Sequence, residues 1–413
     1  MKKKICILST YDELCGNASY TEALAKALSK KIDTTVIGLN TRILRSSYKK
    51  GIETYLNKLC EKLKEYDVVN IQCEAILFGS TASSMRKNFF KVAKSCKKLV
   101  VTMHRVETCS LKNTLFKLSL SFLLHPKKIL SSIKESLSQI YWGGFYKKII
   151  SFLKKTNSSI IVHSKKDQET ILYMGFQDVF DFPLSFFSQD QIELFKKSSS
   201  RETFCKKHGL DEKNTYLGIF GFISSYKGYD TALEALRILP KNYVLLIFGS
   251  QHPLTIKTNE QINPCIQKII SKTKKLKLED RVKFISAIDN NSFIESLIYC
   301  DFNLLPYLEV GQGGSAIAAL SLETHSNAIF SFNKTFIELA KYAPNSFKMF
   351  SMGNYYELAH AILTYDRTIY SNALNNYFNK YNIEKSIDLY ISLFNEEKPP
   401  EIFPSADLRE FKI

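Results

Sequence analysis

A glycine-rich turn in the second half of the chain carries residue types suited to phosphate chemistry. It reads Gly221-Phe222-Ile223-Ser224-Ser225-Tyr226-Lys227-Gly228 and separates the apolar run 216–220 from an amphipathic pattern over 231–236. A helix that begins at such a turn presents free backbone N–H groups and a positive dipole end. We expect Gly221 to shape the turn and Lys227 to bind the diphosphate of a nucleotide. The alternative is a solvated lysine after an ordinary turn.

A second glycine-rich loop follows another apolar run, 302–305. Its residues are Glu309-Val310-Gly311-Gln312-Gly313-Gly314-Ser315, and the apolar pattern 316–320 comes directly after it. Gly311, Gly313 and Gly314 free the backbone to approach a ligand, and a helix start at Ser315 suits a sugar hydroxyl or a phosphate. Alternatively, Glu309 is a loop charge and the glycines serve only a tight turn.

Polar residues also follow three apolar runs in the first half of the chain. Gly16 and Asn17 follow the first run, Glu74 follows 68–72, and His104 follows 98–103. Ligands of open parallel sheets bind at the carboxyl ends of strands, so these residues are candidates for the other side of a site. Each has a simpler interpretation: an ordinary turn for Gly16 and Asn17, an exposed acid for Glu74, a histidine at a core edge for His104.

The elements that would position these residues are short apolar strands alternating with amphipathic helices. This alternation predicts an α/β fold with parallel sheets covered by helices on both faces. At 413 residues the chain is too long for one ordinary core. We expect an N-terminal domain over 1–190, a C-terminal domain over 191–385, and a helix and tail over 386–413. The strands are expected at 5–9, 34–37, 68–72, 98–103, 159–162, 179–182, 216–220, 244–248, 282–285, 302–305 and 328–330.

In their order along the chain, these segments resemble the retaining family-four glycosyltransferases. That family has the GT-B fold, in which two Rossmann-like, doubly wound domains face each other across a cleft. The resemblance covers most of the chain except 111–153 and the last dozen residues. It implies that Lys227, His104 and Glu309 are catalytic. The residues implied to bind the sugar donor are Gly221, Lys227, Glu309, Gly311, Gly313, Gly314 and Ser315, and those implied on the acceptor side are Gly16, Asn17 and Glu74.

Two positions depart from the family pattern. The family usually has an arginine directly after the first glycine, where this chain has Phe222, and a second glutamate eight residues after Glu309, where this chain has Ile317. These departures keep open an alternative, a degenerate glycosyltransferase-like partner or glycan-binding subunit without catalysis. A nucleotide-sugar epimerase is a further alternative, although it would be expected to have more acids and histidines among the site residues.

The resemblance also implies the reaction. A retaining transfer would move a sugar from a nucleotide-diphosphate sugar to a glycan or lipid-linked acceptor, without a protein nucleophile, a metal or a cofactor. The sequence places no Asp-x-Asp pair beside a strand end. We expect a role in the synthesis of a bacterial surface polysaccharide.

A basic segment interrupts the strand–helix alternation at about 111–155. It holds nine lysines and one acid, Glu135, in a chain of net charge +17, together with the aromatic residues Trp142, Phe145, Tyr146 and Phe152. The segment could lie on an anionic membrane surface, pack as extra helices on the first domain, or bind RNA. RNA binding lacks any accompanying fold signature, so no nucleic-acid partner is expected.

Two further patterns bear on the location of the protein. The start Met1-Lys2-Lys3-Lys4-Ile5 imitates a signal peptide, but its apolar stretch is short and is followed by Asp12 and Glu13. Nine cysteines at irregular spacing argue against a disulfide framework or a zinc site. We therefore expect a cytoplasmic protein, peripheral on the inner face of the plasma membrane if the basic segment docks there.

Overall fold

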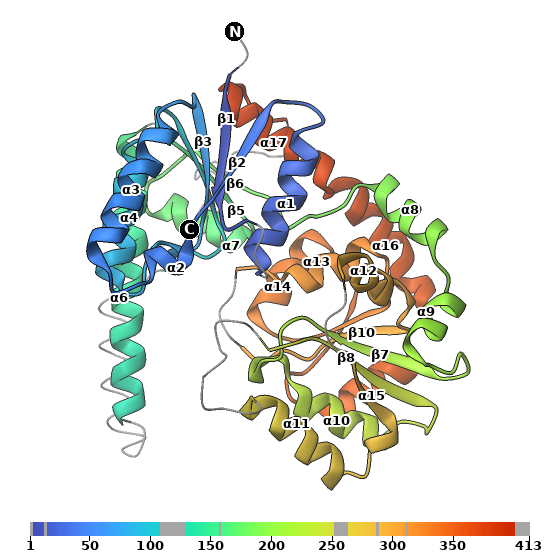
Figure 1. The fold of residues 1–413 in the computed structure, drawn as a ribbon. Coiled ribbons are helices and arrows are strands. Elements are labelled where there is room, and N and C mark those ends of the chain that lie inside the picture. The colour runs from blue at the N-terminus through green and yellow to red at the C-terminus, as the bar shows by residue number, and fades with distance from the viewer. Residues whose placement is uncertain are drawn as a thin grey trace. The chain divides into compact units, whose positions relative to one another are not determined.

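The computed structural model describes residues 3–11, 15–107, 129–156, 158–251, 263–285, 289–309 and 313–400. Its contacts divide the chain into two compact units. Unit 1 comprises Met1–Phe182 together with Ile387–Ile413, and unit 2 comprises Pro183–Ser386. The division after Phe182 precedes the boundary expected at 190, and the end of the C-terminal helix belongs to unit 1. Figure 1 shows the elements of both units.

Unit 1 is built from one sheet with helices on both faces (Figure 1). Its elements are β1 (Ile5–Ser9), α1 (Gly16–Leu28), β2 (Thr34–Gly38), α2 (Thr41–Leu44), α3 (Lys49–Leu63), β3 (Val68–Cys73), η1 (Ala75–Phe78), α4 (Ala82–Ala93), β4 (Leu99–Met103), α6 (Ile129–Lys155), β5 (Ser159–Val162), α7 (Lys165–Tyr173), β6 (Val179–Asp181) and the end of α17 (Ile383–Asn395).

The sheet of unit 1 has six strands in the order β2-β1-β3-β4-β5-β6, and every neighbouring pair is parallel. All residues of β1, β3, β4 and β5 are buried, as expected for strands covered on both faces. The predicted parallel α/β architecture is confirmed, with β1 and β5 at the predicted bounds and the other strands shifted by one residue or so.

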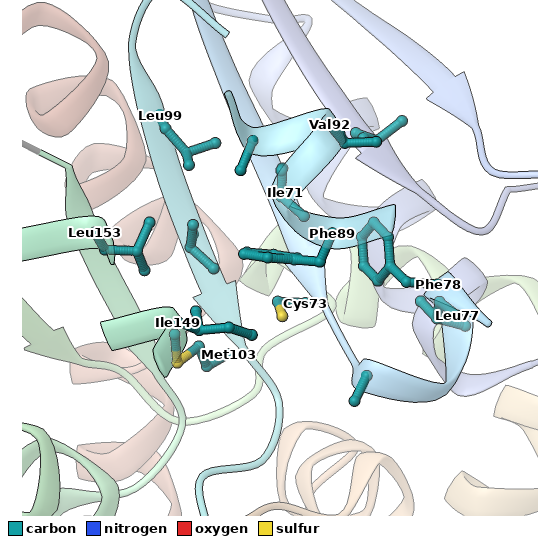
Figure 2. Packing of buried hydrophobic residues seen from close by; sticks show 14 of the residues in the cluster. Ile71, Cys73, Leu77, Phe78, Phe89, Val92, Leu99, Met103, Ile149 and Leu153 are labelled. Atoms are coloured by element: carbon teal, nitrogen blue, oxygen red, sulfur yellow. The ribbon is translucent and has the colours of Figure 1, made fainter. Parts of the chain in front are cut away.

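The helix α6 changes the interpretation of the basic segment. It is the crossover helix between the parallel strands β4 and β5, so at this point the strand–helix alternation continues rather than being interrupted. Figure 2 shows Ile149 and Leu153 of α6 pointing toward β4, where Leu99 and Met103 lie. The C-terminal half of α6 is therefore a core element of unit 1.

Four aromatic residues of the same helix pack on the core of unit 1. Phe145 and Tyr146 are buried, and Trp142 and Phe152 are partly buried against the same core cluster. Phe145 and Tyr146 cannot also insert into a lipid interface, so the membrane interpretation is wrong for these two residues. Residues 111–128 of the predicted segment lie outside the described residues.

Unit 2 repeats the plan of unit 1. Its elements are α8 (Gln189–Ser198), α9 (Arg201–His208), β7 (Thr215–Phe220), η3 (Ser225–Lys227), α10 (Tyr229–Ile238), β8 (Tyr243–Phe248), α11 (Pro264–Lys275), η5 (Glu279–Arg281), β9 (Val282–Ile285), α12 (Asn290–Tyr299), β10 (Phe302–Leu305), α13 (Ala316–Glu323), β11 (Ala328–Ser331), α14 (Lys334–Tyr342), β12 (Lys348–Phe350), α15 (Tyr355–Leu363), α16 (Arg367–Lys380) and the start of α17.

The second sheet also has six parallel strands, in the order β12-β11-β10-β7-β8-β9. Five of them lie where the sequence predicts strands. The short edge strand β12 is not predicted, because its three residues, Lys348-Met349-Phe350, do not form a continuous apolar run.

Each sheet has one place where the strand order reverses. In unit 1 it lies between β1 and β3, and in unit 2 it lies between β7 and β10. Chain segments that leave two such strands diverge to opposite faces of the sheet and open a crevice at the carboxyl ends. The predicted site residues follow these four strands, apart from His104, which follows β4.

Among the described residues, no helix is both long enough and apolar enough to span a membrane.

Candidate active site

Lys227 is the most unusual charged residue of unit 2. It ends the 3-10 turn η3 just before α10, and its side chain is only 3% exposed. The Nζ atom donates to the Phe220 carbonyl at the end of β7 and lies 3.1 Å from the Tyr307 hydroxyl after β10. The ring centroid of Tyr307 lies 5.0 Å from Nζ. The ammonium group is thus held at the strand-order reversal of the second sheet.

The described residues supply no counter-charge to Lys227. Within the described residues no carboxylate pairs with it, and burial lowers the pKa of its amine from 10.5 to about 7. A buried cation without an anion is unfavourable until a ligand supplies the negative charge. The helix α10 next to it has no side-chain cap at its N-terminus, which is the arrangement that binds phosphates.

The two glycines of the turn are explained by close approaches. Gly221 has a φ of 85°, and a Cβ at this position would lie 3.1 Å from Nζ of Lys227 and 3.5 Å from a methyl of Ile317. Gly228 has a φ of 70°, and a Cβ there would lie 1.8 Å from the Pro306 carbonyl oxygen. Glycine is needed at both positions, so that the turn after β7 can pack on the segment after β10.

Ile317 therefore lies beside the lysine, at the position where the resembled family has a second glutamate. Its apolar side chain contributes no charge to Lys227, which is one reason why the lysine amine is unpaired in the described structure. Phe222, the other departure from the family pattern, is half-buried and contributes no charge.

Tyr307 connects the lysine with the helix α13. Its hydroxyl shares a hydrogen bond with the side chain of Ser315 as well as with Lys227. Ser315 is the N-cap of α13 and accepts from the Ala318 N–H at 3.3 Å. Burial raises the pKa of Tyr307 well above its ordinary value, so the hydroxyl keeps its proton. Sequence reasoning missed Tyr307, which reads as one more aromatic residue after an apolar run.

The other predicted residues of the loop 309–315 have no contact with Lys227 among the described interactions. Glu309 is exposed, and its Oε2 accepts from the Lys334 N–H at the start of α14 at 3.0 Å. Gly313 and Gly314 are half-buried, whereas Gly311 lies outside the described residues. Glu309 thus already stabilises a helix N-terminus, and its predicted contact with the sugar donor stays a prediction.

In unit 1 the structure brings Asn17 and Glu74 together at the strand-order reversal. The Asn17 amide donates to Glu74 Oε2 at 3.0 Å. Burial raises the pKa of the Glu74 carboxyl, and Arg105 opposes that rise. Gly16 is exposed, and a Cβ at this position would meet nothing within 4 Å. The pair presents a carboxylate and an amide, groups that bind hydroxyls of a sugar.

His104 lies on the neighbouring strand end and is half-buried. Its Nε2 lies 2.8 Å from Gln72 Oε1, and the Tyr20 ring packs edge-on against it with centroids 5.5 Å apart. The ring of His163 lies 4.9 Å away. Burial, and then His163, hold the pKa of His104 well below 6.5, so the ring is neutral. No sequence signal indicates the contacts with Gln72, Tyr20 and His163, because these residues are distant along the chain.

Groups of three or more His, Cys, Asp or Glu side chains able to hold a metal ion are not found in the described ranges.

No family model matches the chain, and no curated protein matches it by sequence. Solved structures match the chain by their fold. A glycosyltransferase from Rickettsia africae is 14% identical, with a TM-score of 0.66, and the match covers 96% of this chain and 100% of that one. Anabaena HepE in complex with UDP-glucose is 16% identical, with a TM-score of 0.62 and coverage of 94% and 99%. Sucrose-phosphate synthase from Thermosynechococcus elongatus is 15% identical, with a TM-score of 0.62 and coverage of 96% and 100%.

These matches extend over nearly the whole of both units and of the compared chains. At such low identity they establish the architecture and not the chemistry of individual residues. The chain has the GT-B fold, with two Rossmann-like domains, that these glycosyltransferases share.

Proposed function

We propose that this protein is a glycosyltransferase that moves a sugar from a nucleotide-diphosphate sugar to a glycan or lipid-linked acceptor. The observation that carries the proposal is the amine of Lys227, which is buried without a carboxylate partner among the described residues, beside the N-terminus of α10, which has no side-chain cap. A diphosphate supplies the negative charge that this environment lacks.

Charge stabilisation at Lys227 would serve the reaction itself. Transfer requires the nucleoside diphosphate to leave, and a fixed cation with helix N–H groups stabilises the charge that develops on it. Tyr307 would keep the amine in place, since its hydroxyl accepts from Nζ. Ser315 and Glu309 would contact the sugar or ribose from the adjacent loop.

The residues of unit 1 would bind hydroxyl groups. Asn17 and Glu74 form one polar pair, and His104 is neutral. We assign Gly16, Asn17 and Glu74 to the acceptor and His104 to the transferred sugar.

The nucleotide is proposed to be a uridine diphosphate in the first instance. HepE is described in complex with UDP and with UDP-glucose, and trehalose-6-phosphate synthase from E. coli with UDP-2-fluoro glucose. The reaction is proposed to retain the configuration of the anomeric carbon and to need neither a metal nor a cofactor.

The setting is proposed to be the synthesis of a bacterial surface polysaccharide at the inner face of the plasma membrane. Since the aromatic residues of the C-terminal half of α6 are packed on the core, membrane contact would rest on the lysines and on side chains such as Leu137 and Tyr141. These two side chains are 61% and 40% exposed.

A thermal-shift screen against UDP, ADP, GDP, CDP and dTDP tests the central step. A ligand at a hundred times its Kd stabilises the fold by about 2.7 kcal/mol, so the shift is measurable. One nucleotide should raise the Tm of the wild type and fail to raise that of Lys227→Ala. Lys341→Ala is the matched control, because Lys341 is an exposed lysine of unit 2 paired with Glu338.

Turnover is then measured with the corresponding nucleotide sugars, and the anomeric configuration of the product is read by NMR. A Tm shift that persists in Lys227→Ala would show that the lysine does not bind the nucleotide. The absence of a shift with every nucleotide would contradict the proposal and favour a non-catalytic, glycosyltransferase-like partner.

A further inference from the structure

A buried polar network lies beneath His104 in the middle of the first sheet. Asn70 and Gln72 of β3 and Thr102 of β4 are all fully buried. Amide and hydroxyl groups in such a place are unfavourable unless they are hydrogen-bonded, and here each of them is. The network therefore has defined hydrogen-bond directions, which can be followed from one fixed point.

The fixed point is the backbone carbonyl of Val100, which can only accept. Asn70 Nδ2 donates to it at 3.1 Å, so the other end of this amide, Oδ1, is the acceptor toward Gln72. Gln72 Nε2 donates to Asn70 Oδ1 at 2.6 Å, which leaves Gln72 Oε1 as the atom 2.8 Å from His104 Nε2. An amide oxygen cannot donate, so His104 Nε2 must carry the proton.

The same directions extend to the C-terminal helix. Thr102 Oγ1 accepts from Asn70 and Gln72, at 3.1 and 3.3 Å, and therefore donates to the Tyr390 hydroxyl at 2.8 Å. The Tyr390 hydroxyl in turn lies 3.3 Å from the hydroxyl of Tyr20, the residue whose ring packs edge-on against His104. Helix α17, which carries Tyr390, thus holds the network from the far end of the chain.

The second ring nitrogen of His104 is left as an acceptor. Nδ1 makes no hydrogen bond within the described part of the chain, and the ring is neutral. A neutral ring with its proton on Nε2 offers only a lone pair at Nδ1. A ligand group that meets this nitrogen must therefore donate, as a hydroxyl does and an ionised phosphate oxygen does not.

We propose that Gln72 is a positioning residue that fixes the proton of His104 on Nε2, with Asn70, Thr102 and Tyr390 fixing Gln72 in turn. The contact of His104 with a substrate hydroxyl rests on the function proposed above. The tautomer itself does not, because it follows from the protein's own hydrogen bonds.

The test is the nitrogen-15 NMR spectrum of the histidine side chains of the full chain, without any ligand. The His104 signals are assigned by their loss in His104→Asn. Between pH 6 and 8 the wild type should show one neutral tautomer, with the proton on Nε2. A proton on Nδ1, a charged ring or an equal mixture of tautomers at pH 7 would overturn the proposal.

Two variants test the positioning role. Gln72→Leu removes the acceptor, so the Nδ1–H form should appear and kcat should fall about tenfold or more as the ring loses its orientation. Gln72→Glu still offers His104 an oxygen, and its carboxyl, protonated toward Asn70, keeps the bonds to Asn70 and His104 and loses only the donation to Thr102. This variant should keep the wild-type tautomer and a larger share of kcat. Equal spectra and equal kcat for Gln72→Leu and Gln72→Glu would overturn the role.

Tyr390→Phe tests the contribution of α17, and Ser392→Ala is the matched control. Among the described residues, the Ser392 hydroxyl bonds only to the Asp388 carbonyl on the same helix. Tyr390→Phe should raise the Nδ1–H fraction of His104, and Ser392→Ala should not. The nucleotide screen separates the two proposals: nucleotide binding with the wrong tautomer contradicts only this inference, and the predicted tautomer without nucleotide binding contradicts only the function.

Discussion

The Nζ atom of Lys227 lies 3.1 Å from the hydroxyl of Tyr307, and these two residues follow the strands β7 and β10, between which the strand order of the second sheet reverses. A glycine turn and a proline segment bring them together, since Gly228 packs on the Pro306 carbonyl. The fold thus holds a buried amine where the strand order of the second sheet reverses, which is the position at which open parallel sheets bind ligands.

Lys227 should make stability depend on pH. Its pKa is about 7 in the folded state and about 10.5 in the unfolded state, so the unfolded chain binds more protons between these values. The free energy of unfolding therefore rises with pH across this window. From pH 7 to pH 9 the wild type should gain about 2 kcal/mol relative to Lys227→Met. Urea denaturation of both proteins at several pH values measures the difference, and identical pH dependence would contradict the buried, unpaired amine.

Tyr307→Phe should weaken nucleotide binding while the protein stays folded. The change removes one acceptor of Lys227 and costs about 1 kcal/mol of stability, and the Kd for the nucleoside diphosphate should rise about threefold to tenfold. The control is Tyr377→Phe, which removes a buried hydroxyl of unit 2 with no partner among the described residues. Calorimetric titration of the two variants should separate them; equal affinities would assign Tyr307 to packing alone.

Two glycine substitutions should differ in their effect on stability. Gly221→Ala forces an alanine into a left-handed conformation, at a cost of about 1 to 2 kcal/mol, and crowds Lys227. Gly16→Ala meets open space, so its stability should stay within about 0.5 kcal/mol of the wild type. If the loop that leads into Gly16 approaches a substrate, Gly16→Ala should lower turnover even though the stability is unchanged. Full activity of Gly16→Ala with an unchanged Tm would show that Gly16 is not a site residue.

Acid should destabilise unit 1 through His163. This side chain is 6% exposed, its Nδ1 donates to the Phe182 carbonyl, and burial lowers its pKa to about 4. The unfolded state takes up the proton below about pH 6.5 and the folded state only below about 4, so stability falls as the pH falls through this window.

His163→Asn keeps a donor near the Phe182 carbonyl and removes the titration. Between pH 7 and pH 4.5 the variant should lose about 2 kcal/mol less stability than the wild type. Denaturation curves at the two pH values measure this, and an equal loss in both proteins would refute it.

The sequence predicts the sheets well because their strands are short, continuous apolar runs buried on both faces. Residues 5–9, 159–162, 282–285 and 302–305 are strands at the predicted bounds. The basic segment is predicted less well. Its lysines suggest a separate surface element, whereas the apolar residues Ile149 and Leu153 that recur along α6 pack on β4 (Figure 2).

For the candidate site, the sequence indicates the residues at strand ends but not those that hold them. Lys227 and Glu74 stand next to recognisable turns. Tyr307, Gln72 and Tyr390 do not, because their roles depend on contacts between distant strands and helices. The hydrogen bond between Thr102 and Tyr390 joins residues 288 positions apart, and no local sequence pattern predicts it.

The central claim, that Lys227 binds a nucleoside diphosphate, is tested most directly by calorimetric titration at pH 7 in two buffers of different ionisation enthalpy. The nucleotide used is the one that gives the largest thermal shift. Because the pKa of the free amine is about 7 and a diphosphate favours its charged form, binding should take up about half a proton. The uptake and most of the affinity should disappear in Lys227→Met. Equal affinity of the wild type and Lys227→Met, with equal proton uptake, would contradict the account.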